Sequence, residues 1–151
     1  MTRDFFGVLT GKGINFGGSL MRPEATGYGV VYFLEEMLAT RKDSIAGKTV
    51  TISGFGNLGT YVTQKINELG GKVVTLADEA GFVYDPEGIT GDKWEYMSKL
   101  WCVHRKSAKD YADRFHCEWF PGQRPWGVPC DIAIPTATEN ELGLEGGRLP
   151  T

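Results

Sequence analysis

The sequence predicts an α/β protein with a doubly wound, mostly parallel sheet. Residues 48–53 and 72–78 are strand-like apolar runs, and the segment between them repeats apolar residues at helical spacing. Strand, helix and strand together span about thirty residues, the size of a right-handed βαβ unit. A glycine cluster from Gly54 to Gly59 joins the first strand to the helix, and such a junction is where a ligand can approach the backbone closely.

The chain ahead of the first strand predicts a loop followed by a helix. Residues 2–21 are rich in glycine and follow neither the helical nor the strand period. From Pro23 to about Arg41 apolar residues recur at helical spacing, and proline is tolerated in a first helical turn. Gly27 and Gly29 fall inside this helix, where each costs roughly 1 kcal/mol relative to alanine. We therefore expect another backbone or a ligand to approach closely at both glycines.

The helix after the glycine cluster, Asn57 to Leu69, is expected to end at Gly70 and Gly71. Further helices and strands follow it. They are a hairpin-like excursion at 78–88, helices at 90–106 and 108–115, strands at 118–120 and 130–135, and an irregular loop at 121–127. Thr90 is the expected N-cap of the longer helix. The sheet is thus expected to hold about four strands.

The composition is that of one ordinary soluble domain. The 151 residues are 41% hydrophobic and 23% charged, enough to bury a core. A formal net charge of −3 gives no broad basic surface, so general nucleic-acid binding is disfavoured. No run approaches the length of a membrane span, and the N-terminus lacks the apolar region of a secretory signal. We expect no membrane partner and a cytoplasmic location.

Cysteine and histidine are too few and too scattered for a disulfide framework or a zinc site. The three cysteines, Cys102, Cys117 and Cys130, form no C-x-x-C pair. The histidines are His104 and His116. We expect inert thiols, surface or packing histidines, no metal site and no catalytic residue.

The stretch Gly54-Phe55-Gly56-Asn57-Leu58-Gly59 fits the pattern G-x-G-x-x-G between a strand and a helix. In this motif the first glycine allows a tight turn, the second lets the backbone approach a pyrophosphate, and the third lets helix and strand pack closely. The helix N-terminus adds N–H groups and partial positive charge that suit a phosphate. Asp78 ends the second strand 24 residues after Gly54, near the spacing of a carboxylate that accepts from ribose hydroxyls.

The motif alone leaves the nucleotide open. Methyltransferases that use S-adenosylmethionine also combine a glycine-rich first turn with an acidic residue at a strand end. A transferase is therefore a competing class, and the rest of the chain has to decide.

Three blocks carry a resemblance to a known family. They are VLTGKGINFGGSLMRPEATGYGVVYF, SGFGNLGTYV and PGQRPWGVPCDIAIPTATENEL. Together they resemble the hexameric, bacterial-type glutamate dehydrogenases of the Glu/Leu/Phe/Val dehydrogenase family, from about Phe6 to Leu142. The first block is specific to that family, and a methyltransferase would leave RPEATGYG and ATENE unexplained.

The resemblance implies a Rossmann-like domain of an oxidoreductase. That family oxidatively deaminates L-glutamate to 2-oxoglutarate and ammonia and passes hydride to NAD or NADP. Motif matching implies cofactor-binding roles for Gly54, Phe55, Gly56, Asn57 and Leu58 at the pyrophosphate, Asp78 at the adenosine ribose, Thr26 near the nicotinamide amide, Arg22 near the active cleft, and Ala137, Thr138 and Asn140 on the ribose and nicotinamide side.

The choice between NAD and NADP stays open. The paired carboxylates of Asp78 and Glu79 oppose the 2′-phosphate of NADP by Coulomb repulsion. An aspartate at this position nevertheless resembles NADP-using members, and residues 104–106, His-Arg-Lys, could supply positive charge. By analogy the choice leans to NADP.

Family members are much longer than this chain. The resemblance implies that residues 1–22 are a linker from a missing substrate domain. Residues 23–151 would form a dinucleotide-binding domain that is incomplete at its C-terminus, truncated after about four strands. The catalytic lysine and aspartate of the family belong to the missing front part, and Lys12 is not that lysine.

We therefore expect the chain alone to be catalytically inactive. Glutamate or 2-oxoglutarate would bind only in a complete subunit, and the alternative function is that of a non-catalytic dinucleotide-binding fragment. An exposed edge at residues 130–135 predicts marginal stability and self-association.

Overall fold

The computed structural model of the protein describes residues 24–100 and 107–137, and its strands form two three-stranded sheets. Parallel strands in the order β2-β1-β6 build the first sheet, from β1 (Thr49–Ile52), β2 (Lys72–Val73) and β6 (Ile132–Ile134). Antiparallel strands in the order β3-β4-β5 build the second, from β3 (Thr75–Asp78), β4 (Gly81–Tyr84) and β5 (Glu118–Pro121). The predicted α/β class with a parallel sheet is confirmed, and β4 lies in the excursion expected at 78–88.

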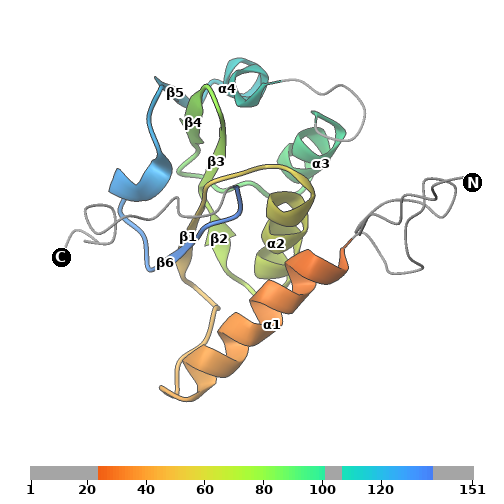
Figure 1. The fold of residues 1–151 in the computed structure, drawn as a ribbon, viewed down its shortest axis with the longest axis vertical. Helices are drawn as coiled ribbons and strands as arrows, with labels where there is room; N and C mark the ends of the chain where they lie inside the picture. Colours follow the sequence, from red (N-terminus) through yellow and green to blue (C-terminus); the bar gives the residue numbers. More distant parts are fainter. Residues whose placement is uncertain (1–23, 101–106, 138–151) are drawn as a thin grey trace, which may run out of the picture.

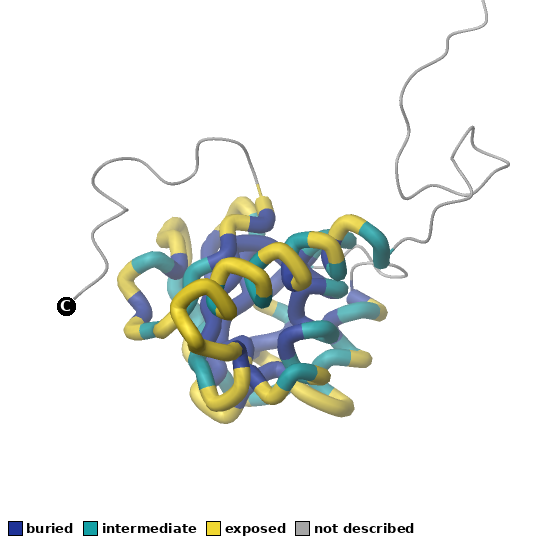
Figure 2. The backbone as a smooth tube through the Cα atoms, turned by 90° about the horizontal axis from the view of Figure 1, so that it is seen from below, coloured by how far each residue is buried: buried dark blue, intermediate teal, exposed yellow. Residues whose placement is uncertain are grey.

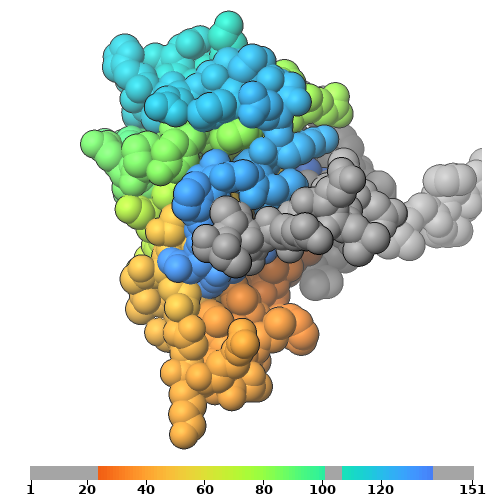
Figure 3. Space-filling view, turned by 90° about the vertical axis from the view of Figure 1, so that its left-hand side faces the viewer, coloured from red at the N-terminus to blue at the C-terminus, as the bar shows by residue number. Residues whose placement is uncertain are grey.

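The helices pack around these sheets. They are α1 (Ala25–Ala39), α2 (Asn57–Glu68), α3 (Asp92–Lys99), α4 (Ala108–Phe115) and a 3-10 turn, η3 (Pro125–Gly127). Helix α1 packs against α2, α2 against α3, and α4 against β4; α1, α2 and α3 lie on one side of the strands and η3 on the other (Figure 1). Buried positions collect in the interior (Figure 2), and the chain from η3 to β6 covers part of the face opposite the helices (Figure 3).

The run at 72–78, expected as one strand, divides between the two sheets at Val74. The Val74 N–H still bonds to the Val50 carbonyl at 3.0 Å. At the next position a side chain takes the place of the backbone as the hydrogen-bond partner of β1. The Thr75 hydroxyl accepts from the Ile52 N–H and donates to the Ile52 carbonyl, both at 2.9 Å. A buried hydroxyl thus ends the parallel ladder on this side of β1. The prediction of one continuous strand is corrected accordingly.

Helix α2 ends as predicted. Gly70 has a φ of +85° and its N–H bonds to the Asn67 carbonyl at 3.1 Å, while the Gly71 N–H bonds to the Ile66 carbonyl at 2.9 Å. This is the Schellman arrangement, in which glycine takes the left-handed position without steric cost. The two glycines therefore satisfy helix carbonyls that would otherwise lack partners.

The start of α3 differs from the prediction. Its N-cap is Gly91, with a φ of 52°, and no side chain caps it, so the prediction of Thr90 as the N-cap was wrong. Glycine adopts this backbone conformation more readily than threonine does. Asp92 and Glu95 place negative charge in the first turn instead, which favours a helix N-terminus. The predicted end of this helix at Lys106 lies outside the described residues.

The two glycines of α1 have different surroundings. A Cβ on Gly27 would lie 2.7 Å from Tyr61 Cβ and 3.0 Å from Val62 N, so the backbone of α2 comes as close as expected. For Gly29, no atom of the described residues lies within 4 Å of the Cβ position. No described backbone therefore approaches Gly29, and the alternative of a ligand at this glycine stays a prediction. The predicted helix start at Pro23 lies outside the described residues.

The carboxylate of Asp85 joins β4 to α3 and α4. It is 2% exposed, and its Oδ2 accepts from Lys93 Nζ and from the Tyr111 hydroxyl, each at 2.8 Å. Its Oδ1 accepts from the Glu87 N–H at 3.1 Å. Burial, and then the charge of Asp85, raises the pKa of Tyr111, and the same causes raise the pKa of Cys117 to about 11. This buried ionic cluster holds α4 against the second sheet.

Candidate functional site

The glycine turn connects β1 to α2 and leaves the start of that helix without a side-chain cap. Gly56 is the N-cap, with φ −67° and ψ −164°, and the first turn of α2 carries no acidic residue. A helix N-terminus is the positive end of the helix dipole and favours an anion. No carboxylate of the first turn of α2 therefore offsets this charge, and a phosphate could do so.

Gly54 and Gly59 have steric tasks within this turn. A Cβ on Gly59 would collide with the carbonyl oxygen of Gly54, so α2 can start close behind β1 only with glycine at this position. A Cβ on Gly54 would lie 3.0 Å from the carbonyl oxygen of Thr136. These contacts agree with the close packing expected from the G-x-G-x-x-G pattern.

The chain beyond β6 lies beside the glycine turn. The Gly54 N–H donates to the Thr136 hydroxyl at 2.9 Å, and the Thr136 N–H donates to the Ser53 hydroxyl, also at 2.9 Å. Ala137, which follows, is exposed, and its Cα would be 3.4 Å from a Cβ on Gly54. Two segments predicted for the cofactor therefore meet at the carboxyl ends of adjacent parallel strands, where open α/β sheets bind ligands.

Asp78 ends β3 and is engaged by the protein itself. Its Oδ1 accepts from the N–H groups of Ala80 and Gly81 at 2.8 and 3.1 Å. Its Oδ2 accepts from the Ser107 hydroxyl at 2.8 Å and from the Ala108 N–H at 2.7 Å. The carboxylate predicted to face the adenosine ribose thus also caps α4. A ribose hydroxyl would have to share an oxygen that already accepts two hydrogen bonds.

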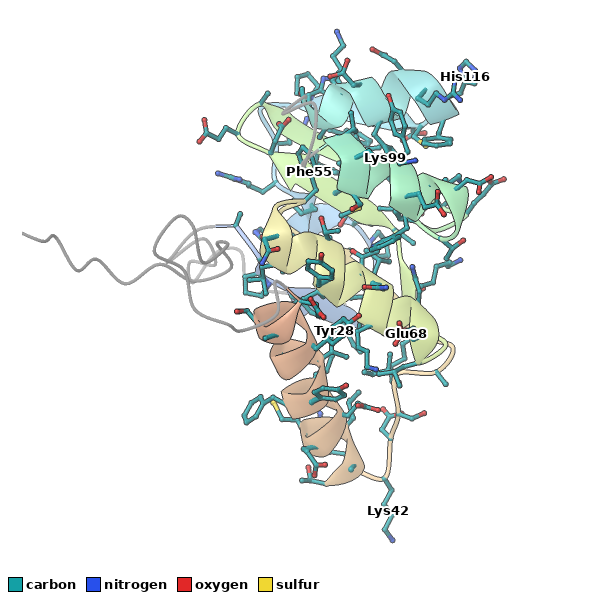
Figure 4. The ribbon with its side chains drawn as sticks, turned by 90° about the vertical axis from the view of Figure 1, so that its right-hand side faces the viewer. Tyr28, Lys42, Phe55, Glu68, Lys99 and His116 are labelled. Carbon is teal, nitrogen blue, oxygen red and sulfur yellow. The ribbon has the colours of Figure 1, made fainter. Side chains whose placement is uncertain are left out.

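The other described candidates divide between the core and the surface. The side chain of Phe55 is 6% exposed and belongs to the main core, and it lies near the start of α2 (Figure 4). Leu58 is half-buried and packs on the same core, whereas Thr26 is exposed in the first turn of α1. Phe55 and Leu58 therefore anchor the turn with their side chains. The predicted residues Arg22, Thr138 and Asn140 lie outside the described residues.

Sequence reasoning missed Thr136 and the Ser107 cap. Ser107 and Asp110 form a capping box at α4, with the Ser107 N–H donating to Asp110 at 3.1 Å. The spacing S-x-x-D before a helix was a usable signal for that cap. No periodicity could have indicated Thr136, because its role depends on the proximity of two segments 82 residues apart.

The described residues contain no group of three or more His, Cys, Asp or Glu side chains arranged to hold a metal ion. Within the same ranges, no helix is long and apolar enough to cross a membrane. A hollow of about 340 Å³ has a lining that includes Phe82, Phe120 and Arg124. None of the predicted cofactor residues lines it.

Comparisons with known proteins agree on one family. The model of the glutamate/leucine/phenylalanine/valine dehydrogenases matches residues 17–148. The chain is 52% identical over 141 residues to the NADP-specific glutamate dehydrogenase of Haemophilus influenzae. The matched residues cover 93% of this chain and 31% of that protein. It is 50% identical over 143 residues to the NAD-specific glutamate dehydrogenase of Clostridium symbiosum, covering 94% of this chain and 32% of that protein.

A solved structure gives the same result. The glutamate dehydrogenase of Plasmodium falciparum superposes with a TM-score of 0.83 at 40% identity, over 97% of this chain and 32% of that chain. The chain spans about a third of the length of the relatives that it matches.

Proposed function

Because the chain belongs to the glutamate/leucine/phenylalanine/valine dehydrogenase family, we propose that it is the dinucleotide-binding part of an oxidoreductase. The full enzyme would oxidatively deaminate L-glutamate to 2-oxoglutarate and ammonia, with NADP or NAD as the hydride acceptor. The observation that carries the proposal is the uncapped N-terminus of α2 behind the turn from Gly54 to Gly56. Both the family and this feature favour a ligand that presents phosphate.

The residues of the turn fit such a ligand. With glycine as the N-cap of α2, the cap residue has no side chain that would occupy the place of an incoming pyrophosphate. The side chain of Phe55 is buried in the core and anchors the turn. Ala137 is exposed, so its backbone is accessible to a ligand. When bound, the nicotinamide ring would supply the hydride acceptor. The chain's own contribution is to bind and orient the dinucleotide.

The preference between the two dinucleotides depends on how much negative charge faces the 2′-phosphate. Asp78 accepts four hydrogen bonds, including one from the N-terminus of α4, so part of its charge is already offset. Glu79 is exposed and remains to oppose a phosphate. This arrangement weakens the electrostatic argument for NAD, and we lean to NADP.

Parallel titrations of the purified chain with NADP, NAD and S-adenosylmethionine test the proposal. We expect saturable heat release, or a ligand-dependent rise in melting temperature, with at least one nicotinamide dinucleotide. Gly56→Val should weaken that binding, because its side chain would stand at the N-terminus of α2. Gly127→Val is a matched control, since open space surrounds this glycine. Binding of S-adenosylmethionine alone would replace the proposal with a methyltransferase.

We further propose that the chain alone does not turn over glutamate. Deamination needs a general base and groups that hold the substrate carboxylates, and the family resemblance implies that the catalytic lysine and aspartate belong to a part of the enzyme ahead of these residues. The chain would then act alone as a dinucleotide-binding module, with L-glutamate as a partner only in a complete subunit. Glutamate-dependent reduction of NADP or NAD by the pure chain would contradict this proposal.

A further inference from the structure

The hydroxyl of Thr136 occupies a junction that the backbone ladder does not close. Pairing between β1 and β6 ends at Ile52 and Ile134. Two residues later Thr136, 9% exposed, receives the Gly54 N–H on its Oγ1 at 2.9 Å, and the same hydroxyl lies 3.4 Å from the Gly54 carbonyl oxygen. Its own N–H donates to the Ser53 hydroxyl at 2.9 Å. Side chains thus continue the connection between the strands after the ladder has stopped.

This connection determines the shape of the glycine turn. The Thr136 Oγ1 would be 3.4 Å from a Cβ on Gly59, and the Thr136 carbonyl would be 3.0 Å from a Cβ on Gly54. The end of β1, the start of α2 and the chain beyond β6 therefore meet around one threonine. Because the Gly54 N–H points at this hydroxyl, the turn has to present other N–H groups, from its later residues, to a phosphate.

A similar arrangement occurs on the other side of β1. There the Thr75 hydroxyl accepts from the Ile52 N–H and donates to the Ile52 carbonyl. Threonine hydroxyls thus bond the backbone on both sides of the carboxyl end of β1. Of the backbone groups that they bond, the Gly54 N–H belongs to the glycine turn itself. A buried N–H that loses its acceptor is costly, so the turn would change shape if this hydroxyl were removed.

We propose that Thr136 is a positioning residue for dinucleotide binding. Its hydroxyl joins the glycine turn to the chain beyond β6, so that the turn proposed for the pyrophosphate and Ala137 keep one relative position. This inference rests on the proposed function. It adds a residue that contacts the turn and need not contact the ligand.

The test compares three variants of the full 151-residue chain. Thr136→Val removes the hydroxyl and keeps the shape, and Thr136→Ser keeps the hydroxyl. Thr51→Val is the control, because Thr51 is a buried threonine of β1 whose hydroxyl contacts Cys130 Sγ at 3.4 Å and not the glycine turn. Each variant is titrated with NADP and NAD, and the hydrogen exchange of the Gly54 amide is measured without ligand.

We expect Thr136→Val to accelerate exchange of the Gly54 amide and to raise the Kd for the dinucleotide about tenfold, which corresponds to about 1.4 kcal/mol. The Kd values of Thr136→Ser and Thr51→Val should stay within about twofold of the Kd of the parent chain. If the valine variant does not fold, Thr136→Ala against Thr136→Ser gives the same comparison. A folded valine or alanine variant with an unchanged Kd would overturn the inference.

The two proposals fail in different ways. If the parent chain binds neither NADP nor NAD, the proposed function fails, and the positioning role falls with it even if the Gly54 amide responds to the substitution. If the parent chain binds and the variants without the hydroxyl bind equally well, only the role of Thr136 fails.

Discussion

The carboxylate of Asp78 accepts a hydrogen bond from the hydroxyl of Ser107, with 2.8 Å between Oδ2 and Oγ, although the residues are 29 positions apart. The same oxygen accepts the Ala108 N–H at 2.7 Å. The last residue of β3 therefore holds the first turn of α4. A carboxylate that sequence spacing assigns to the ribose thus has a structural task as well, and substitutions of Asp78 will affect both.

Asp78→Asn should destabilise the fold. The amide nitrogen cannot accept a hydrogen bond, so at least one pair of donors would lose its acceptor, and the charge at the N-terminus of α4 would be lost. We expect the free energy of unfolding to fall by about 1–3 kcal/mol, the usual size for hydrogen bonds to charged groups. Urea denaturation at pH 7 measures this change.

Glu79→Gln is the matched control for that substitution. It makes the same chemical change at an exposed neighbour that forms no hydrogen bond or ion pair with another residue in the described ranges, and it should alter the free energy of unfolding by less than about 0.5 kcal/mol. Equal effects of the two variants would show that net charge, and not the bonds of Asp78, sets the result.

Ser107→Ala tests the pairing directly. Removing the hydroxyl takes one donor from Asp78 and one acceptor from the Lys109 N–H, and loss of an N-cap costs about 1 kcal/mol. In a double-mutant cycle with Asp78→Asn we expect a coupling energy of about 0.5–3 kcal/mol, because contacting residues are not additive. A coupling energy near zero would mean that the two side chains act independently.

The glycines of α1 should respond in opposite directions to alanine. Gly29→Ala adds a methyl group in open space and removes a glycine from a helix interior, so the free energy of unfolding should rise by about 0.5–1 kcal/mol. Gly27→Ala would place Cβ 2.7 Å from Tyr61 Cβ and should lower it by about 1–3 kcal/mol through overpacking. Thermal or urea denaturation of both variants measures these changes in the free energy of unfolding. A gain for Gly27→Ala would mean that α1 shifts away from α2 at little cost.

Local sequence signals predicted the parts of the fold that depend on local physics. The helix Asn57–Leu69 and its glycine end, the short helix Ala108–Phe115, and the strand–turn–helix at the glycine cluster depend on periodicity and on backbone preferences. Residues 72–78 differ, because a strand-like run gives no indication of which partner strand each of its residues pairs with. The hydroxyl of Thr75 determines this, by ending the ladder at Ile52.

The same distinction between local signals and contacts of distant segments applies to the candidate site. The motif predicted the close packing at Gly54 and Gly59, where an added Cβ would meet the backbone of Thr136 and of Gly54. The role of Gly56 at the pyrophosphate stays a prediction. The double role of Asp78 could not be predicted, since its bonds to Ser107 and Ala108 form only when α4 folds onto β3. Thr136 was missed for the same reason.

The buried ionic cluster around Asp85 should make the fold sensitive to alkali. Burial and the charge of Asp85 raise the pKa of Cys117 to about 11 from an ordinary value of 9.0, and they also raise the pKa of Tyr111. Burial opposes the charge of Lys93, but Asp85 and Glu87 outweigh it, so the pKa of Lys93 is raised as well. In each case the folded state holds its proton to a higher pH than the unfolded state does.

Stability should therefore be constant up to about pH 9 and fall above it. Between pH 9 and 11 the unfolded state releases the Cys117 proton while the folded state keeps it, and from about pH 10 the unfolded state also releases the Tyr111 and Lys93 protons, which the folded state keeps. Because the unfolded state then binds fewer protons, the free energy of unfolding decreases with pH. Urea denaturation at intervals from pH 7 to 11 measures the profile.

Cys117→Ala separates the thiol from the rest of the cluster. The variant should lose the part of the decline that begins near pH 9 and keep the part that begins near pH 10, where the unfolded state starts to release the Tyr111 and Lys93 protons, because the Asp85 bonds to both residues remain. The comparison depends on the slopes of the two profiles, so a uniform offset from the lost side chain does not affect it. A parent chain whose stability is unchanged from pH 8 to 11 would contradict the assignment of these protons to the folded state.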